Sequence, residues 1–134
     1  MSISVLDQDI AKLREIKQKV LCGERIDEFT NYNQCIYCVN YRKRMDGRDR
    51  GTCDNCPLHI IAERKYYQKI RVNGCYMFEP YRSMIRIAHI SKHDPNYDRA
   101  QLADAVQRTI DLMESNREEL IALEAQVQAF KKRL

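Results

Sequence analysis

Two C-x-x-C pairs, separated by fourteen residues, constrain the fold of this chain more than any other feature. The first pair is Cys35 and Cys38, and the second is Cys53 and Cys56. Each pair offers two thiolates from one tight turn, and the loop between the pairs is long enough to fold back and close a tetrahedron around Zn²⁺. The sequence therefore predicts a structural zinc ion as the cofactor.

Two other residues are alternative ligands. Cys75 can replace Cys53, and His59 lies three residues beyond Cys56. Between Tyr32 and Phe78 aliphatic residues are sparse and charges are dense, so burial alone would not hold this segment together. A structural zinc ion supplies on the order of 10 kcal/mol to such a segment. The ligands are expected to be four of these six cysteine and histidine side chains.

The cellular compartment decides between metal and disulfides, because six cysteines would also suit three disulfides in a secreted protein. Residues 1–7 lack a basic region followed by an apolar one, and no apolar run approaches the ~20 residues of a membrane span. We therefore expect a cytoplasmic protein of the producing or infected cell, without a membrane partner. Its reduced cysteines would favour metal.

Apolar residues recur at three- and four-residue steps over residues 4–22, which predicts an amphipathic helix. Ser4 and Asp7 resemble a capping box, and Gly23 is placed to end the helix in a left-handed conformation. Cys22, in the last turn, is interpreted as a small buried apolar residue and not as a ligand.

Two further helices are predicted after the cysteine pairs. Pro57 suits the first position of a helix that runs to about Ile70. Pro80 opens another over residues 79–93, which Asp94 and Pro95 end; the same two residues can cap the helix that follows. The expected inward-facing residues are Leu58, Ile61, Tyr66 and Ile70 in the first helix, and Met84, Ile87 and either Ala88 or Ile90 in the second.

A heptad repeat runs from about Asn96 to Lys132 without Gly or Pro, and predicts one long helix. One series is Val106, Met113, Leu120, Val127 and Leu134, and its companion is Leu102, Thr109, Asn116, Leu123 and Phe130. Asn116 falls on this seam, where a polar side chain costs stability but fixes register.

These elements predict a mainly α fold. An amphipathic N-terminal helix (1–23) pairs with the long C-terminal helix of a helical segment (80–134), and a zinc-binding module (24–79) is inserted between them. The first helix can cover only half of the long seam. The remainder needs the helix of residues 79–93, a second copy in a homodimer, or a partner.

Positive charge gathers on the cysteine-bearing segment, with nine Lys/Arg against four Asp/Glu between Tyr41 and Arg71. Arginines on a zinc-held loop suit phosphate contacts, and tyrosines can stack on bases. The alternative is a solvated face with tyrosines packed over a small core. The basic residues are Arg42, Lys43, Arg44, Arg48 and Arg50, interleaved with Tyr37, Tyr41, Tyr66, Tyr67 and Tyr76.

Enzymatic interpretations fit poorly. The chain has no H-x-E before a P-C-x-x-C, and no Gly-rich phosphate loop or nucleophile elbow. His89 and His93 are four residues apart on a predicted helix, a spacing that can bind one metal. Ile90 stands where the H-E-x-x-H pattern has Glu, so we interpret them as surface or partner-facing histidines.

The order C-x-x-C, basic loop, C-x-x-C-Pro-Leu and a later Gly-Cys resembles small cysteine-cluster proteins of bacteriophages and prophages, over about a third of the chain. The resemblance implies an accessory factor, and some small phage proteins inhibit host nucleic-acid machinery such as CRISPR effectors and RNA polymerase. The leading hypothesis is a non-enzymatic zinc-binding inhibitor or regulator with a larger protein partner. The alternative is a transcriptional regulator that binds DNA or RNA directly through loop 42–50.

Overall fold

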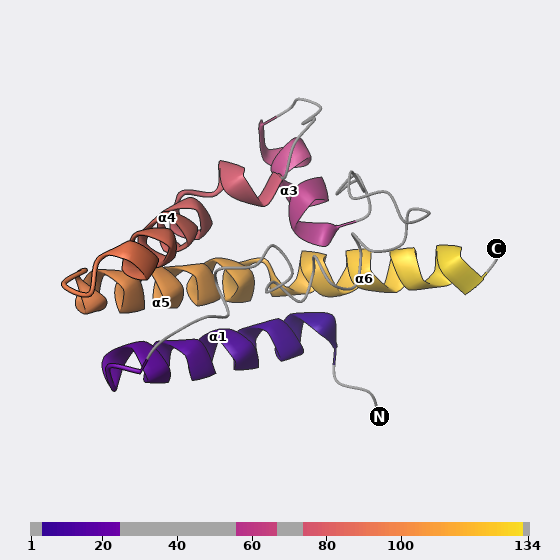
Figure 1. Cartoon of the computed structure of the whole chain (residues 1–134). Helices are drawn as coiled ribbons and strands as arrows, with labels where there is room; N and C mark the ends of the chain where they lie inside the picture. The colour runs from indigo at the N-terminus through magenta and orange to yellow at the C-terminus, as the bar shows by residue number, and fades with distance from the viewer. Residues whose placement is uncertain (1–3, 25–55, 67–73, 133–134) are drawn as a thin grey trace.

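The computed structural model describes residues 4–24, 56–66 and 74–132 of the chain (Figure 1). Within these ranges the chain forms five α-helices and one 3₁₀ helix and has no β-strand, which confirms the predicted mainly α fold. None of the described helices is long and apolar enough to cross a membrane. The elements are α1 (Val5–Leu21), α3 (Pro57–Tyr66), η4 (Gly74–Met77), α4 (Glu79–His93), α5 (Arg99–Ser115) and α6 (Arg117–Lys132).

The first helix, α1, has the caps that the sequence predicts. The Ser4 hydroxyl accepts a hydrogen bond from the Asp7 amide at 3.1 Å and donates one to the Asp7 carboxylate at 2.8 Å. Gly23 has a φ of 76°, a conformation that glycine adopts without steric cost. The prediction that Cys22 is buried is wrong, because it is exposed. Cys22 follows the buried Val20 by two residues. Two residues correspond to about 200° around a helix, so the Cys22 side chain faces water.

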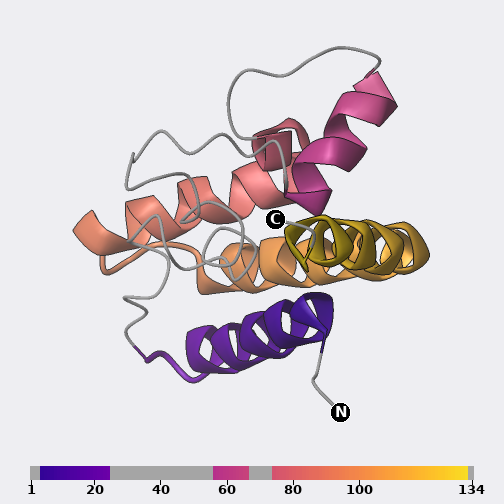
Figure 2. The same ribbon diagram turned by 90° about the vertical axis from the view of Figure 1, so that its right-hand side faces the viewer.

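Helix α5 lies between α1 and α4 as the middle layer of the fold (Figures 1 and 2). Polar contacts show that α1 runs antiparallel to the α5–α6 chain. The Lys17 ammonium donates to the Gln107 amide oxygen at 2.9 Å, whereas the Val5 amide at the other end of α1 donates to Glu124 at 2.8 Å. Helix α1 therefore lies along α5 and reaches the first half of α6.

The core is built from one apolar face of each layer. On α4, Ala88 and not Ile90 completes the inner face, because Ile90 is exposed. The buried side chains are Leu6, Ile10, Leu13, Ile16 and Val20 of α1, Leu102, Val106, Ile110 and Met113 of α5, and Tyr81, Met84, Ile87 and Ala88 of α4. Three amphipathic helices thus supply the hydrophobic burial that stabilises the fold.

The single long helix predicted for residues 96–132 is wrong, because the structure has two helices in its place. Helix α5 begins at Arg99, and its N-cap is Asp98, which accepts a hydrogen bond from the Gln101 amide at 3.0 Å. The expected cap at Asp94 and Pro95 is therefore also wrong.

The helices α5 and α6 are separated at Asn116, which has φ −110° and ψ 16°. Its side-chain amide donates to the Leu112 carbonyl at 2.8 Å, one turn back. Such local bonds give the backbone an alternative to continuing the helix. The residue expected to fix the register of a continuous seam instead ends α5.

The described part of the heptad seam is buried within this one chain. Its buried positions are Leu102, Val106, Thr109, Met113, Leu120 and Leu123. Helices α1 and α4 pack on α5, and α3 packs on α6. The helix of residues 79–93, one of the three alternatives for this cover, packs on α5, whereas α3, which was not among them, packs on α6.

Candidate metal centre

Three of the four simplest zinc ligands, Cys35, Cys38 and Cys53, lie outside the described residues, as does the basic loop 42–50 with Tyr41. Three other candidate ligands are described: Cys56, His59 and Cys75. Their positions therefore show how the end of the predicted zinc module joins the helical fold.

Cys56 and Cys75 lie on two elements that pack against each other. Cys56 directly precedes α3, and its carbonyl accepts a hydrogen bond from the Ile60 amide at 3.0 Å. Cys75 lies in η4, and its carbonyl accepts from the Phe78 amide at 3.2 Å. Their exposed fractions are 6% and 7%, and α3 contacts η4. Both thiols are thus shielded from water, as the ligands of a closed structural site are.

His59 lies in the first turn of α3 and is only 2% exposed, so its side chain is buried. Its Nε2 atom lies 3.3 Å from the Glu63 carboxylate, four residues further along the helix. This approach is not a hydrogen bond, so it does not fix which ring nitrogen of His59 would bind a metal.

The donor set suits zinc, because thiolates and imidazole are its usual ligands. In the described ranges no three His, Cys, Asp or Glu side chains form a group able to hold a metal ion. A tetrahedral site that includes Cys56 or Cys75 therefore needs ligands from residues 35–53. The residues that are described are compatible with such a site, and a bound zinc ion would crosslink that segment to α3.

Helix α3 anchors this region to the rest of the protein. Leu58, Ile61 and Ala62 are buried, and the Arg64 guanidinium contacts the Glu119 carboxylate of α6 at 2.8 Å. Tyr66 is exposed, contrary to its predicted inward position. Its hydroxyl donates to the Met77 carbonyl at 3.2 Å and so ties α3 to η4.

His89 and His93 lie together on α4, with ring centroids 5.5 Å apart and ring planes at 74°. Both side chains are exposed. The described residues offer them no third ligand for a metal site. They are surface histidines, as interpreted from the sequence.

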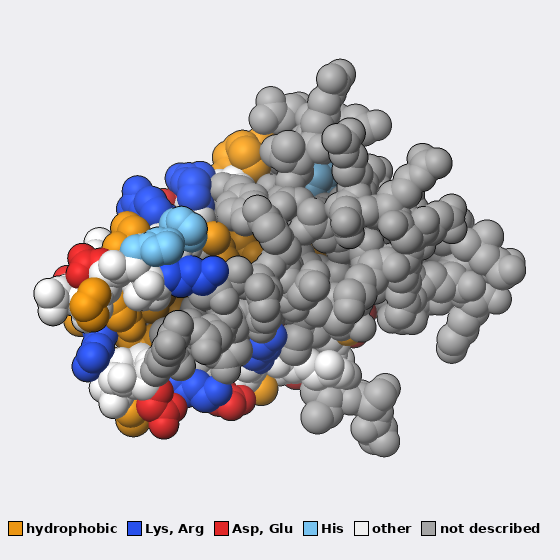
Figure 3. All heavy atoms as spheres, viewed as in Figure 1, with side chains coloured by type: hydrophobic (Ala, Val, Ile, Leu, Met, Phe, Trp, Pro, Cys, Tyr) orange, Lys and Arg blue, Asp and Glu red, His pale blue; other side chains and the backbone are white. Residues whose placement is uncertain are grey.

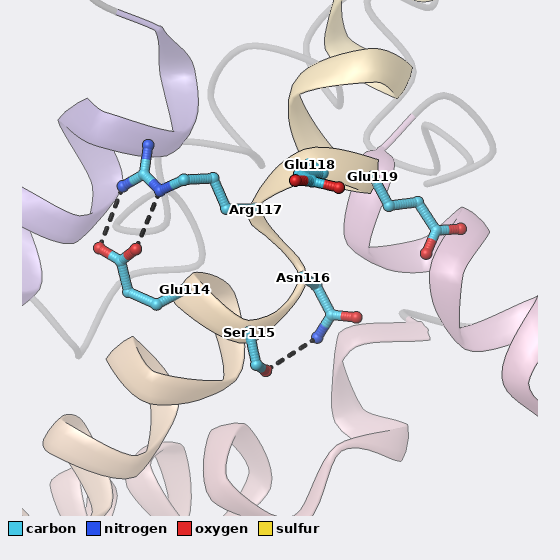
Figure 4. Close-up of a pocket in the computed structure, with 6 residues that line it drawn as sticks. All are labelled: Glu114, Ser115, Asn116, Arg117, Glu118 and Glu119. Carbon is cyan, nitrogen blue, oxygen red and sulfur yellow. Dashed lines mark hydrogen bonds and ion pairs between the residues drawn. The ribbon is translucent and has the colours of Figure 1, made fainter.

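A concave surface of about 670 Å³ marks the junction between α5 and α6 and is lined by residues 114–119 (Figure 4). Arg117 donates to Glu114 at 2.9 and 3.0 Å, and its guanidinium also lies 2.9 Å from the Asp7 carboxylate of α1. The charged groups here join helices to one another. We interpret this surface as a structural junction.

The Asp7–Arg117 pair predicts a small pH dependence of stability. The hydrogen bond from Arg117, followed by that from Ser4, lowers the pKa of Asp7 below its usual value. The pair should therefore stabilise the fold above the unfolded-state pKa of about 3.9, and this stabilisation should be lost as the pH falls through the lower folded-state pKa. D7N should cost less than about 1 kcal/mol at pH 7, because the pair is exposed to water.

Urea unfolding at pH 7, 4 and 2.5 tests this pH dependence. The difference between wild type and D7N should shrink as the solution becomes acidic. D111N, which alters an exposed α5 carboxylate that accepts from Gln107, is the control for the loss of one surface charge at pH 7. A difference for D7N that is constant from pH 7 to 2.5 would contradict the predicted ionisation.

No protein-family model, curated protein or solved structure matches this chain. Function is therefore inferred from its own residues and their geometry.

Proposed function

We propose that this chain is a non-enzymatic zinc-binding interaction protein. A structural zinc ion holds segment 35–75, and the helical fold presents that segment to a larger protein partner. The resemblance to cysteine-cluster proteins of bacteriophages and prophages supports a role as a phage-type inhibitor or regulator of host nucleic-acid machinery, of which anti-CRISPR proteins and transcription inhibitors are examples.

The burial of Cys56 and Cys75 on adjacent, packed elements supports this proposal. Cys56 opens a helix whose apolar face is buried and whose Arg64 contacts α6. Cys75 lies three residues before Phe78, the buried N-cap position of α4. The segment that ends in these two cysteines thus joins a packed fold at defined positions. A preorganised surface loses less conformational entropy on binding than a flexible surface does.

Affinity capture from host extract, with and without nuclease, tests the proposal. A captured protein is identified, purified and titrated against zinc-loaded wild type, C35S/C38S and C22S. We expect binding to survive nuclease and to weaken at least tenfold in C35S/C38S, because the zinc ligands are lost. C22S changes an exposed cysteine outside the cluster and should bind as wild type does.

Two outcomes would contradict the proposal. Capture that disappears after nuclease treatment would indicate that the chain is held through nucleic acid, and not through a protein interface. Partner affinity that is unchanged in C35S/C38S would show that the cysteine segment does not form the interface.

A further inference from the structure

The outward face of α4 carries a row of basic and imidazole side chains that the zinc module does not explain. The row consists of four residues at successive steps of four, three and four positions: Arg82, Arg86, His89 and His93. At about 100° per residue these four positions fall within an arc of about 60°, opposite the face that packs on α5. All four are exposed. We call them the α4 row.

Carboxylates are absent from this part of the helix. No Asp or Glu occurs between Pro80 and His93. Glu79, the first residue of α4, accepts a hydrogen bond from Ser83 at 2.6 Å and is paired with Arg108 of α5. The one acidic side chain of α4 thus bonds to its own helix and to α5, and the nearby charge of Arg82 also contributes to lowering its pKa.

Other exposed helix faces of this protein mix the two signs of charge. On α1, Lys19 lies 3.5 Å from Glu15, and on α5 Arg108 lies 2.9 Å from Asp104, each pair one turn apart. Such pairs are the usual composition of a solvated helix face. Beyond Glu79, α4 carries no carboxylate with which the α4 row could form such pairs along its own helix. In the space-filling view, histidine and Lys/Arg side chains gather on the surface over α4 (Figure 3).

The length and chemistry of the α4 row match a linear array of phosphates. From Arg82 to His93 the helix rises about 16 Å, at 1.5 Å per residue. A row of this length can reach more than one phosphate of a nucleic-acid backbone, which carries one charge per about 3.4 Å of helix axis on each strand. Arginine offers five N–H donors and a neutral imidazole offers one, and all of these can donate to phosphate oxygens.

A protein partner fits the α4 row less well. The centres of protein–protein interfaces are depleted of charged residues and depend on buried apolar or aromatic anchors. The 60° arc contains no apolar side chain; the nearest exposed one, Ile90, lies about 40° outside it. A row of cationic and imidazole donors without an anchor is instead typical of backbone contacts to nucleic acid.

We propose that the α4 row binds the phosphodiester backbone of nucleic acid, independently of sequence. This inference goes beyond the proposed protein-binding function and concerns residues other than those of loop 42–50. Arg82 and Arg86 supply the charge, and His89 and His93 extend the row with hydrogen-bond donors.

Fluorescence anisotropy with a labelled 20-base-pair DNA duplex, between 50 and 300 mM KCl, tests the proposal on the full zinc-loaded chain. R82Q/R86Q should weaken binding about tenfold or more at 100 mM KCl. It should also reduce the slope of log Kd against log salt by about 2, since each phosphate contact contributes about 0.9. The single variant R86Q should reduce the slope by about 1, which keeps the test valid if the double variant is poorly folded.

The matched control is K12Q/R14Q, which removes the same charge from α1, on the side of α5 away from α4 (Figure 2). Its Kd should change less than about twofold. A single strand of the same sequence should show the same ranking of variants, with about 0.7 per contact.

Three results would overturn the proposal. One is no binding by the wild type at 50 mM KCl. Another is equal weakening by the two double variants, which would indicate bulk charge alone. The third is displacement of DNA by polyglutamate as effectively as by unlabelled DNA, which would indicate an acidic protein surface as the ligand.

Discussion

Removal of the metal is expected to unfold α3 while α1, α4 and α5 remain packed. Helix α3 has only ten residues, and helices shorter than about 12–15 residues are marginal in water without tertiary support. Zinc binding contributes on the order of 10 kcal/mol to comparable modules. The buried side chains of α1, α4 and α5 themselves include none of the candidate ligands, although Cys56 and Cys75 border on the same core. Hydrogen exchange followed by mass spectrometry, with and without chelator, measures protection in each helix.

The matched variants for this experiment are C35S/C38S and C22S. C35S/C38S should reproduce the loss of protection in α3 without chelator, and C22S should leave it unchanged. Protection of α3 that persists after complete metal removal would show that burial against α6 is sufficient, and that the metal does not hold this part of the fold.

The second large effect is expected at Leu102, whose side chain is 0% exposed in the middle layer of the fold. L102A should cost about 2–5 kcal/mol, because it removes buried methyl groups and leaves a cavity between packed helices. Leu21 is 54% exposed at the end of α1, so the same substitution there, L21A, should cost less than about 0.5 kcal/mol. Urea unfolding followed by helical circular dichroism gives both values.

Equal destabilisation by L102A and L21A would contradict the three-layer arrangement of α1, α5 and α4. The two variants remove the same atoms, so their difference isolates burial from helix propensity.

The fold was predictable where hydrophobic periodicity and caps are strong. The apolar stripe of α1, its Ser4 cap and Gly23, and the inner face of α4 all follow from local sequence. Periodicity failed at Asn116, because a heptad pattern does not report whether a side-chain amide competes for the backbone. The heptad pattern also indicated that the seam is apolar, but it did not indicate which helices cover the seam. The choice of covering helices depends on contacts between residues distant in the sequence.

The candidate sites were predictable only in part. Cysteine spacing indicates a metal site, but it does not show that Cys56 and Cys75 are buried on neighbouring elements. The burial of His59 beside Glu63 has no distinct sequence signal. The α4 row did have a sequence signal, which is the absence of Asp and Glu from Pro80 to His93. Its significance required the helix, which places residues at steps of four, three and four on one face.

Native mass spectrometry of the purified chain tests the central claim, that a zinc ion bound by cysteine thiolates holds the middle of this protein. The predicted mass is that of one chain with one Zn²⁺ bound, and no disulfide. A chain without metal, or a mass lowered by two hydrogens for each pair of oxidised cysteines, would contradict the claim.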